Sequence, residues 1–399
     1  MRAIKILQQT ICPLLGFVHA TRLAAVLWAV GALVRGGKLY LTALGRHGAG
    51  SSMTKHAIKR ADRLLGNEHL HAQVPLFFAA VARLLIGSRQ RPVVLVDWTL
   101  VGAEHVALVA AVPLDGRSLP IYLEVHPKKK DNNPAVMRRF LKKLHEVLPQ
   151  RCRPIIVTDA GFRNDWFADV AALGWDFVGR VRSNPLVRDL VNPEWFPAKK
   201  LYEQATSRAK DLGLWLLVQM NPRPVRLVLA KKWTRVSRSM IRGTTMARKA
   251  RSRAFEPWLL ATSLAETEAK RVVDLYAKRM QIEETFRDAK NHRFGWSFKD
   301  AQSGSTKRYE VLLLLATLGM LAATMAGSAA ESSGEHKHYQ ANTVRERRVL
   351  SLFFLGSALL RHSETFFFPV EKICSTLREI REKMPSVAPH ESSCFVGIP

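Results

Sequence analysis

After Gly87 the pattern of hydrophobic and polar positions changes from helical segments to short apolar runs that are typical of strands. The first run, Pro92 to Trp98 (PVVLVDW), is continuous, as in a strand buried on both faces, and it ends in an acid. Two further strands are predicted from His105 to Val112 and from Ser118 to Val125, and Asp115-Gly116 between them marks an antiparallel hairpin. The pattern therefore predicts a change from an all-helical to an α/β region.

The next segment predicts alternating helices and strands. Asn133 to Leu148 has helical spacing, and Pro154 to Phe162 (PIIVTDAGF) is a second buried strand that ends in an acid. A helix from Asn164 to Leu173 and a strand from Trp175 to Val181 follow. The order β-β-β-α-β-α-β is that of ribonuclease H-like folds, where the first strand lies at the centre beside the fourth. We expect an α/β fold with a ribonuclease H-like catalytic core on a mixed five-stranded sheet.

Two aspartates, Asp97 and Asp159, stand at the ends of buried strands. If these strands are parallel neighbours, both carboxylates lie at one sheet edge, where α/β sheets place their ligands. Carboxylates that face each other raise each other's pKa unless a cation lies between them, and their hard oxygen atoms suit Mg²⁺ or Mn²⁺. Either aspartate alone is better explained as a turn or helix-cap residue. As a pair in this topology they predict a metal site.

A candidate third ligand lies in the segment YAKRMQIEETFRDAK. At about 100° per residue, one narrow stripe of a helix carries a phenol, a carboxylate and three cations: Tyr276, Glu283, Arg279, Arg287 and Lys290. Burying such a stripe would leave charges unpaired, so it favours a face that presents one metal ligand among phosphate-binding residues. Glu284 falls outside the stripe and is interpreted as a helix-surface residue.

The 123 residues between Asp159 and Glu283 exceed what a ribonuclease H-like core needs, so an insertion is predicted. Three strands are expected in this stretch: Leu212 to Met220, Val225 to Lys232 and Trp258 to Ser263. Lys231 to Arg253 has nine basic residues and no acid, which favours a flexible loop that tracks a DNA backbone. A solvated loop is the alternative.

A basic helix is predicted before the α/β region. Lys38 to Gly66 suggests a short helix, a glycine-rich turn, and a second helix that Ser51 or Ser52 could cap and Gly66 could end. The second helix carries four cations: Lys55, Lys59, Arg60 and Arg63. This pattern resembles a helix-turn-helix whose second helix faces DNA, with a solvated basic helix as the alternative.

The charge balance indicates a polyanionic partner. The 399 residues include 61 Lys plus Arg against 33 Asp plus Glu, a formal charge of +28, and a polyanion would relieve the self-repulsion. Nucleic acid is the first candidate and an anionic membrane the second. The apolar segments Ala24 to Val34 and Val311 to Gly327 read as core helices, so no membrane partner is expected. With no signal peptide in Met1 to Ala20 and no CxxC among four cysteines, a reducing cytoplasm fits.

These residues together resemble the bacterial cut-and-paste DDE transposases of the insertion-sequence-four family. Tyr276-x2-Arg279-x3-Glu283-x6-Lys290 matches the family's Y-R-E-K pattern. Asp97 in VLVDW and Asp159 in VTDAGF look like the first two acids of the Asp-Asp-Glu triad, and the similarity runs through IKRADRLLGN, LGWDFVGRVR and QANTVRERRVLS.

The resemblance implies an enzyme that binds inverted-repeat transposon ends as a homodimer. It would cleave them by hydrolysis and hairpin formation, and then join the 3′ ends to target DNA. The implied catalytic and metal-binding residues are Asp97, Asp159 and Glu283, with two Mg²⁺ ions per site, or Mn²⁺ as a substitute. Such a protein would act in the bacterial cytoplasm, associated with the nucleoid.

The resemblance also implies a set of DNA contacts. Tyr276, Arg279 and Lys290 would hold phosphates near the transposon end. Trp258 would stack on a base flipped out of the duplex, although a core position is its alternative, and Arg182 would lie near the active-site DNA or be a surface charge. Arg345, Arg347 and Arg348 form a plausible phosphate-binding cluster.

Four regions are predicted from these patterns. Residues 1–88 would form a helical DNA-binding domain, 89–184 with 264–330 the catalytic domain, 185–263 the β-rich insertion and 331–399 a helical C-terminal region, whose tail departs from the family's apolar ending. Two other functions remain open: a ribonuclease H-like endonuclease without strand transfer, and a DNA-binding protein that has lost catalysis.

Overall fold

The structure is a computed structural model that describes residues 2–48, 50, 52–182, 184–231, 256–293, 295–341, 343–344, 346–361 and 369–387. In these residues it is a mixed α/β protein with ten strands and flanking helices, consistent with a ribonuclease H-like fold. The chain forms two compact units. Unit 1 comprises Met1–Cys152 and Met280–Val387, and unit 2 includes Arg153–Arg279. The division into four functional regions stays a prediction.

Unit 1 contains a three-stranded antiparallel sheet in the order β3-β2-β1. Its strands are β1 (Val93–Leu100), β2 (His105–Leu114) and β3 (Arg117–Pro127). The hairpin prediction is confirmed, since Asp115 and Gly116 have the positive φ angles, 42° and 88°, that a tight turn requires. β1 continues past Trp98 to Leu100, so Asp97 lies inside the strand and not at its end as predicted.

The two faces of this sheet are covered by different helices. On one face, Tyr122 packs against Phe78 of α5 (Glu68–Ile86) and Phe140 of α6 (Pro134–Val147), with ring centroids 6.2 and 5.1 Å apart. On the other face, α10 (Met280–Lys290) contacts all three strands. The predicted helix over Asn133 to Leu148 is confirmed as α6, which Asn133 caps.

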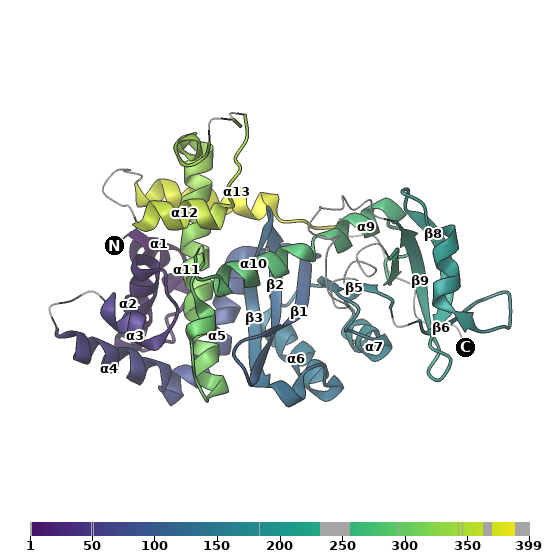
Figure 1. Cartoon of the computed structure of the whole chain (residues 1–399), viewed down its shortest axis with the longest axis horizontal. Coiled ribbons are helices and arrows are strands. Elements are labelled where there is room, and N and C mark those ends of the chain that lie inside the picture. The colour runs from purple at the N-terminus through teal and green to yellow at the C-terminus, as the bar shows by residue number, and fades with distance from the viewer. Residues whose placement is uncertain are drawn as a thin grey trace, which may run out of the picture. The chain divides into compact units, whose positions relative to one another are not determined.

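The core of unit 1 is α11 (Thr306–Ser332), the long helix in Figure 1. It contacts the neighbouring helices α1 (Arg2–Thr10), α2 (Ala20–Gly36), α5, α12 (Leu352–Arg361) and α13 (Val370–Lys383). Two helices of the described chain, α5 and α11, are long and apolar enough to cross a membrane. However, 94% of the relevant window of α11 is buried in the protein, as predicted for a core helix. The apolar part of α2 is also buried.

The N-terminal helix pair is close to the prediction. α3 (Leu41–Arg46) and α4 (Thr54–Leu65) pack together, and Gly66 ends α4 as expected. The residue at the N-cap is Met53, without a capping side chain, so the predicted cap by Ser52 is wrong. Ser51 lies outside the described residues.

The sheet of unit 2 is larger and mixed. β4 (Ile155–Thr158) and β5 (Asp176–Arg180) are parallel and joined through α7 (Asn164–Ala172), as predicted. The order continues β5-β10-β9-β8-β6-β7 with antiparallel pairing. These strands are β10 (Trp258–Thr262), β9 (Arg223–Ala230), β8 (Lys210–Leu217), β6 (Leu186–Asp189) and β7 (Phe196–Pro197).

The three strands predicted in the insertion are therefore confirmed as β8, β9 and β10, and they extend the sheet that begins with β4 and β5. β6 and β7 were not predicted. Residues 232–255, which include nearly all of the basic segment Lys231 to Arg253, lie outside the described residues. The predicted adjacency of the first and fourth strands would join the two units and stays a prediction.

Candidate active site

Asp97 lies on β1, directly opposite Val109 of β2. Residues Val93 to Val96 are fully buried, whereas Asp97 is partly exposed, so the carboxylate stands where the strand leaves the core. One of its oxygens, Oδ1, accepts a hydrogen bond from the backbone N–H of Trp98 at 2.9 Å. This contact fixes the orientation of the carboxylate.

The acid-bearing helix α10 lies across the sheet on the Asp97 side. Its buried residues Ile282, Thr285 and Ala289 recur at helical spacing and form the side that packs inward, whereas Glu283 is exposed. Thr285 fixes the register, because its hydroxyl oxygen accepts from the backbone N–H of Ser118 at 2.8 Å. Glu283 and Glu284 do differ in environment, but Glu284, which was predicted to be a helix-surface residue, is the less exposed of the two.

Lys290 reaches β1 from the last turn of α10. Its Nζ donates to Thr99 Oγ1 at 2.5 Å, and Thr99 is two residues after Asp97 on the same side of the strand. The pKa of Lys290 is lowered to about 8, mainly by burial and also by the charge of Lys299, whereas the negative charge of Asp97 opposes both effects. The structure thus brings together two of the predicted site residues, Lys290 and Asp97.

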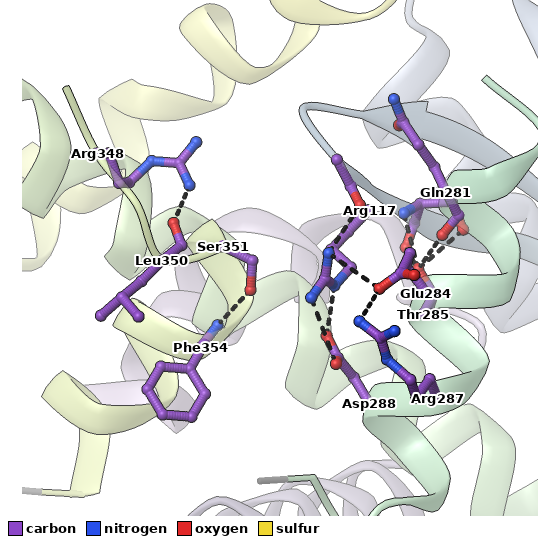
Figure 2. A network of polar contacts seen from close by, with 12 residues as sticks. Arg117, Gln281, Glu284, Thr285, Arg287, Asp288, Arg348, Leu350, Ser351 and Phe354 are labelled. Carbon is purple, nitrogen blue, oxygen red and sulfur yellow. Dashed lines mark hydrogen bonds and ion pairs between the residues drawn. The ribbon is translucent and has the colours of Figure 1, made fainter. Parts of the chain in front are cut away.

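Arg117 anchors the middle of α10 to the start of β3, as Figure 2 shows. Its guanidinium donates to Asp288 Oδ2 at 2.5 Å and lies 3.7 Å from Glu284 Oε2. Glu284 also pairs with Arg287, one turn further along the helix. Glu284 is therefore a structural ion-pair residue, and Arg287, a predicted DNA contact, is engaged by it while its side chain stays 63% exposed.

The single helix predicted from Tyr276 to Lys290 is wrong. α9 (Ala269–Ala277) ends before a turn at Lys278 and Arg279, and α10 then begins at Met280. The turn interrupts the helical phase on which the stripe was based. Tyr276 and Arg279 belong to unit 2, whereas Glu283, Arg287 and Lys290 belong to unit 1.

Tyr276 is buried in unit 2, with 4% of its surface exposed, although an exposed phosphate contact was predicted. Its ring meets Trp258 edge to face at 4.8 Å between centroids. Burial raises the pKa of Tyr276, Arg279 and Arg180 oppose that rise, and the charge of Asp159 adds to it. Tyr276, Arg279, Trp258 and Asp159 are therefore neighbours.

Asp159 follows β4 directly, as predicted, and its Oδ1 accepts from the backbone N–H of Gly161 at 2.8 Å. Within the described part of the chain, no group of three His, Cys, Asp or Glu side chains lies close enough to hold a metal ion. Asp97 and Glu283 share unit 1 and Asp159 lies in unit 2. Their grouping into one triad stays a prediction.

Unit 2 contains a cleft of about 430 Å³. One of the residues that line it is Ala160, which directly follows Asp159. Three arginines line it: Arg163, Arg180 and Arg182. Arg182, a predicted DNA contact, donates to Glu256 Oε2 at 2.9 Å, and Arg180 lies 3.5 Å from the same oxygen. Arg163 was missed by the sequence analysis, because one arginine after a strand carries no recognisable signal.

The predicted DNA contacts outside the core differ in exposure. All four cations of α4 are exposed, and the guanidinium of Arg60 stacks over the Trp28 ring at 4.5 Å from its centroid. Arg348 is only 8% exposed and pairs with Asp115 and Glu331, so a phosphate contact there would require these pairs to open. Arg345 lies outside the described residues.

Unit 1 thus presents an aspartate on a buried strand and, on the helix across it, an exposed glutamate and a lysine that reaches the aspartate's strand. With the mixed sheet, this arrangement is consistent with the ribonuclease H-like class of nucleic-acid enzymes. Residues 88–320, more than half of the chain, match the family model described as "Transposase DDE domain", and the chain belongs to that family. The search of curated proteins gave no match.

Family membership implies that the protein is an enzyme of DNA transposition and that it binds DNA. DDE transposases as a class use divalent metal ions, which agrees with the carboxylates predicted for the site. The matched residues contain Asp97, Asp159 and Glu283, the lysine-bearing helix α10 and the whole of the β-rich insertion.

Proposed function

We propose that this protein is a cut-and-paste transposase of the insertion-sequence-four type. It binds inverted-repeat ends, cleaves them by hydrolysis and hairpin formation, and joins the 3′ ends to target DNA in the bacterial cytoplasm. The observation that carries this proposal is the approach of Lys290 to Thr99 and Asp97, because it joins the lysine of the Y-R-E-K pattern to the first predicted acid.

Asp97, Asp159 and Glu283 would hold Mg²⁺ or Mn²⁺. Their carboxylate oxygens are the hard donors that these ions prefer, and backbone N–H groups orient both aspartates. Two bound ions would supply an activated water or 3′-hydroxyl and stabilise the leaving oxygen of an in-line displacement.

The remaining residues of the site bind and orient DNA. Lys290 and Arg279 offer cations to the phosphates beside the scissile bond. Trp258 is partly exposed and Tyr276 supports its ring from one side, so its position suits stacking on an unpaired base at the hairpin. Two inverted repeats must be cut in one event, and we infer a homodimer on DNA.

The two adjacent glutamates provide the experiment. Glu283→Gln and Glu284→Gln are compared in Mg²⁺-dependent cleavage of a duplex that carries the element's own end. Glu283→Gln should lose activity by about 100-fold or more, since even outer-shell partners of metal ligands cost up to about that factor. Glu284→Gln should retain most of it and have a lower free energy of unfolding.

Equal loss of cleavage in both variants would sink the assignment of Glu283. Strand joining is measured in the same reaction with a plasmid target. Cleavage by the wild-type protein without any joined product would favour the endonuclease alternative.

A further inference from the structure

We propose that unit 1 carries a second, sequence-independent DNA-binding surface, which holds the target duplex. We call it the α6 basic face. It consists of seven cations from the 3₁₀ turn η2 (Lys128–Lys130) and from α6: Lys128, Lys129, Lys130, Arg138, Arg139, Lys142 and Lys143. The inference rests on the proposed function, which requires the protein to hold duplexes of any sequence.

The charge of this face is concentrated and one-sided. All seven side chains are exposed, and two exposed acids, Asp131 and Glu146, accompany them, so the cations of the face outnumber its acids by seven to two. The opposite side of α6 is buried through Phe140, Leu141 and Leu144, so the helix cannot rotate to bring its cations inward. Like-charged neighbours on a helix repel each other, and bound phosphates would remove that cost.

A buried acid holds two of these cations in place. Glu124 on β3 is 6% exposed and lies 3.8 Å from Arg139 and 3.5 Å from Lys143. Burial alone would raise the pKa of Glu124, but contacts with His126, Tyr122 and Lys143 lower it to about 2. The acid therefore stays charged at neutral pH. The side chains of Arg139 and Lys143 are 54% and 47% exposed, so each remains accessible from outside.

The α6 basic face begins at the end of the sheet where β1 ends. Pro127 pairs with His105, and the Lys128 N–H donates to Glu104 O in the β1–β2 loop at 2.8 Å. Asp97 of β1 pairs with Val109 of β2, which in turn pairs with Leu123 of β3, so the three residues form one row across the sheet. Leu123 lies four residues before Pro127, which is about 13 Å along the strand. One turn of duplex is about 34 Å long. The η2 end of this face therefore lies within one turn of duplex of the row of the sheet that carries Asp97, measured along β3.

The chemistry of the face points to a duplex of any sequence. Five of its seven cations are lysines, which bind phosphates as point charges without the fixed fork by which arginine reads guanine. α6 also packs on the opposite face of the sheet from α10. The surface is thus separate from Lys290, the residue of unit 1 that is proposed to hold the transposon end.

The test uses the full-length chain. One variant carries Lys128→Gln, Lys129→Gln and Lys130→Gln, and a second carries Arg138→Gln and Lys142→Gln. Arg139 and Lys143 are kept because they pair with Glu124. The matched control carries Lys5→Gln, Lys372→Gln and Arg378→Gln, three exposed cations of α1 and α13. Thermal unfolding of each variant checks that the fold is intact.

Affinity for a random-sequence duplex is measured by fluorescence anisotropy over a range of salt concentrations. The triple variant should bind about tenfold more weakly, with a salt slope reduced by about three, one for each lost phosphate contact. Cleavage of the end duplex should stay within about twofold of wild type. Joining to a plasmid should fall at low target concentration and recover at high concentration.

Two results would overturn the proposal. If the control variant loses as much random-duplex affinity as the triple variant, the face is only solvated. If end cleavage falls while joining per cleaved end is unchanged, the surface holds the transposon end and not the target. If the wild-type protein neither cleaves nor joins, the proposed function fails, whereas the anisotropy comparison still decides whether this face binds DNA.

Discussion

Glu283 and Glu284 are neighbours in the sequence but have different partners. Glu284 lies beside Arg117 and pairs with Arg287, which ties it to β3 and to the next helical turn. Glu283 is exposed on α10. Adjacent residues on a helix point about 100° apart, so one acid can stabilise the helix while the other faces a ligand.

Arg117→Met should lower the free energy of unfolding by about 1–3 kcal/mol, because Asp288 and Glu284 would lose a charged hydrogen-bond partner in a half-buried site. Urea unfolding measures the change. Arg287→Met is the control, since its side chain is 63% exposed and its removal should cost less than about 0.5 kcal/mol. Equal losses in the two variants would show that Arg117 does not anchor α10.

Lys290 should give end binding a pH dependence in metal-free buffer. Its pKa is lowered to about 8, so the side chain is a cation at pH 7 and mostly neutral at pH 9.5. The affinity of the wild-type protein for end DNA should fall by about tenfold over this range, the value of one charged hydrogen bond. Lys290→Arg stays charged throughout and should flatten the profile. A profile unchanged in that variant would rule out Lys290 as the titrating group.

At the scale of elements, strands and helices with a strong pattern were predictable, whereas breaks that depend on distant contacts were not. The apolar runs predicted β1 and β5 within two residues of each end, and the run Pro154 to Phe162 contains β4 but extends four residues beyond it. The turn at Lys278 and Arg279 was missed because both residues fit a helix and the apolar spacing continues through them. β7 has only two residues and leaves no periodic signal.

In the candidate active site, too, the features that depend on distant contacts could not be predicted from the sequence. Thr99 could have been found, because strand alternation places it on the Asp97 side. Arg117 could not, since its partner Asp288 is 171 residues away. The burial of Tyr276 under Trp258 also depends on tertiary packing that a local motif does not encode.

The stability that Glu124 of β3 provides by pairing with α6 should depend on pH. Because Glu124 has a pKa of about 2 against an ordinary 4.5, its contribution to stability is complete above pH 4.5 and is lost as the pH falls toward 2. The difference in unfolding free energy between wild type and Glu124→Gln should therefore shrink by about 1 kcal/mol between pH 6 and pH 3.5. Urea titrations at each pH measure it. A difference that does not change with pH would contradict the assignment.

At the scale of the whole molecule, the predicted site residues are divided between two compact units. Asp97, Glu283 and Lys290 belong to unit 1, whereas Asp159 and Tyr276 belong to unit 2. The chain passes from unit 2 to unit 1 at the turn between α9 and α10. Because this turn lies between two parts of the Y-R-E-K pattern, we expect DNA cleavage to depend on the length of the turn.

Two glycines inserted between Arg279 and Met280, where the chain passes from unit 2 to unit 1, should leave the contacts within each unit intact and abolish cleavage. A displacement of about 1 Å at an active site can cost about 100-fold in rate, and this insertion moves the connection by more. Thermal unfolding should change little, and end cleavage should fall by at least that factor. The control places the same glycines after Gly116 in the β2–β3 turn. Normal cleavage by the first variant would show that the two parts of the pattern act independently.

The ion pair between Arg117 and Asp288 of α10 should also affect which residues occur at these positions in related proteins. An acid at position 288 stabilises the packing of α10 only when position 117 is an arginine. We therefore expect the two positions to change together among relatives. Position 284 should accept any residue that can lie beside Arg117 and Arg287. Position 283 has no such freedom, and in an alignment it should stay constant while its neighbour varies.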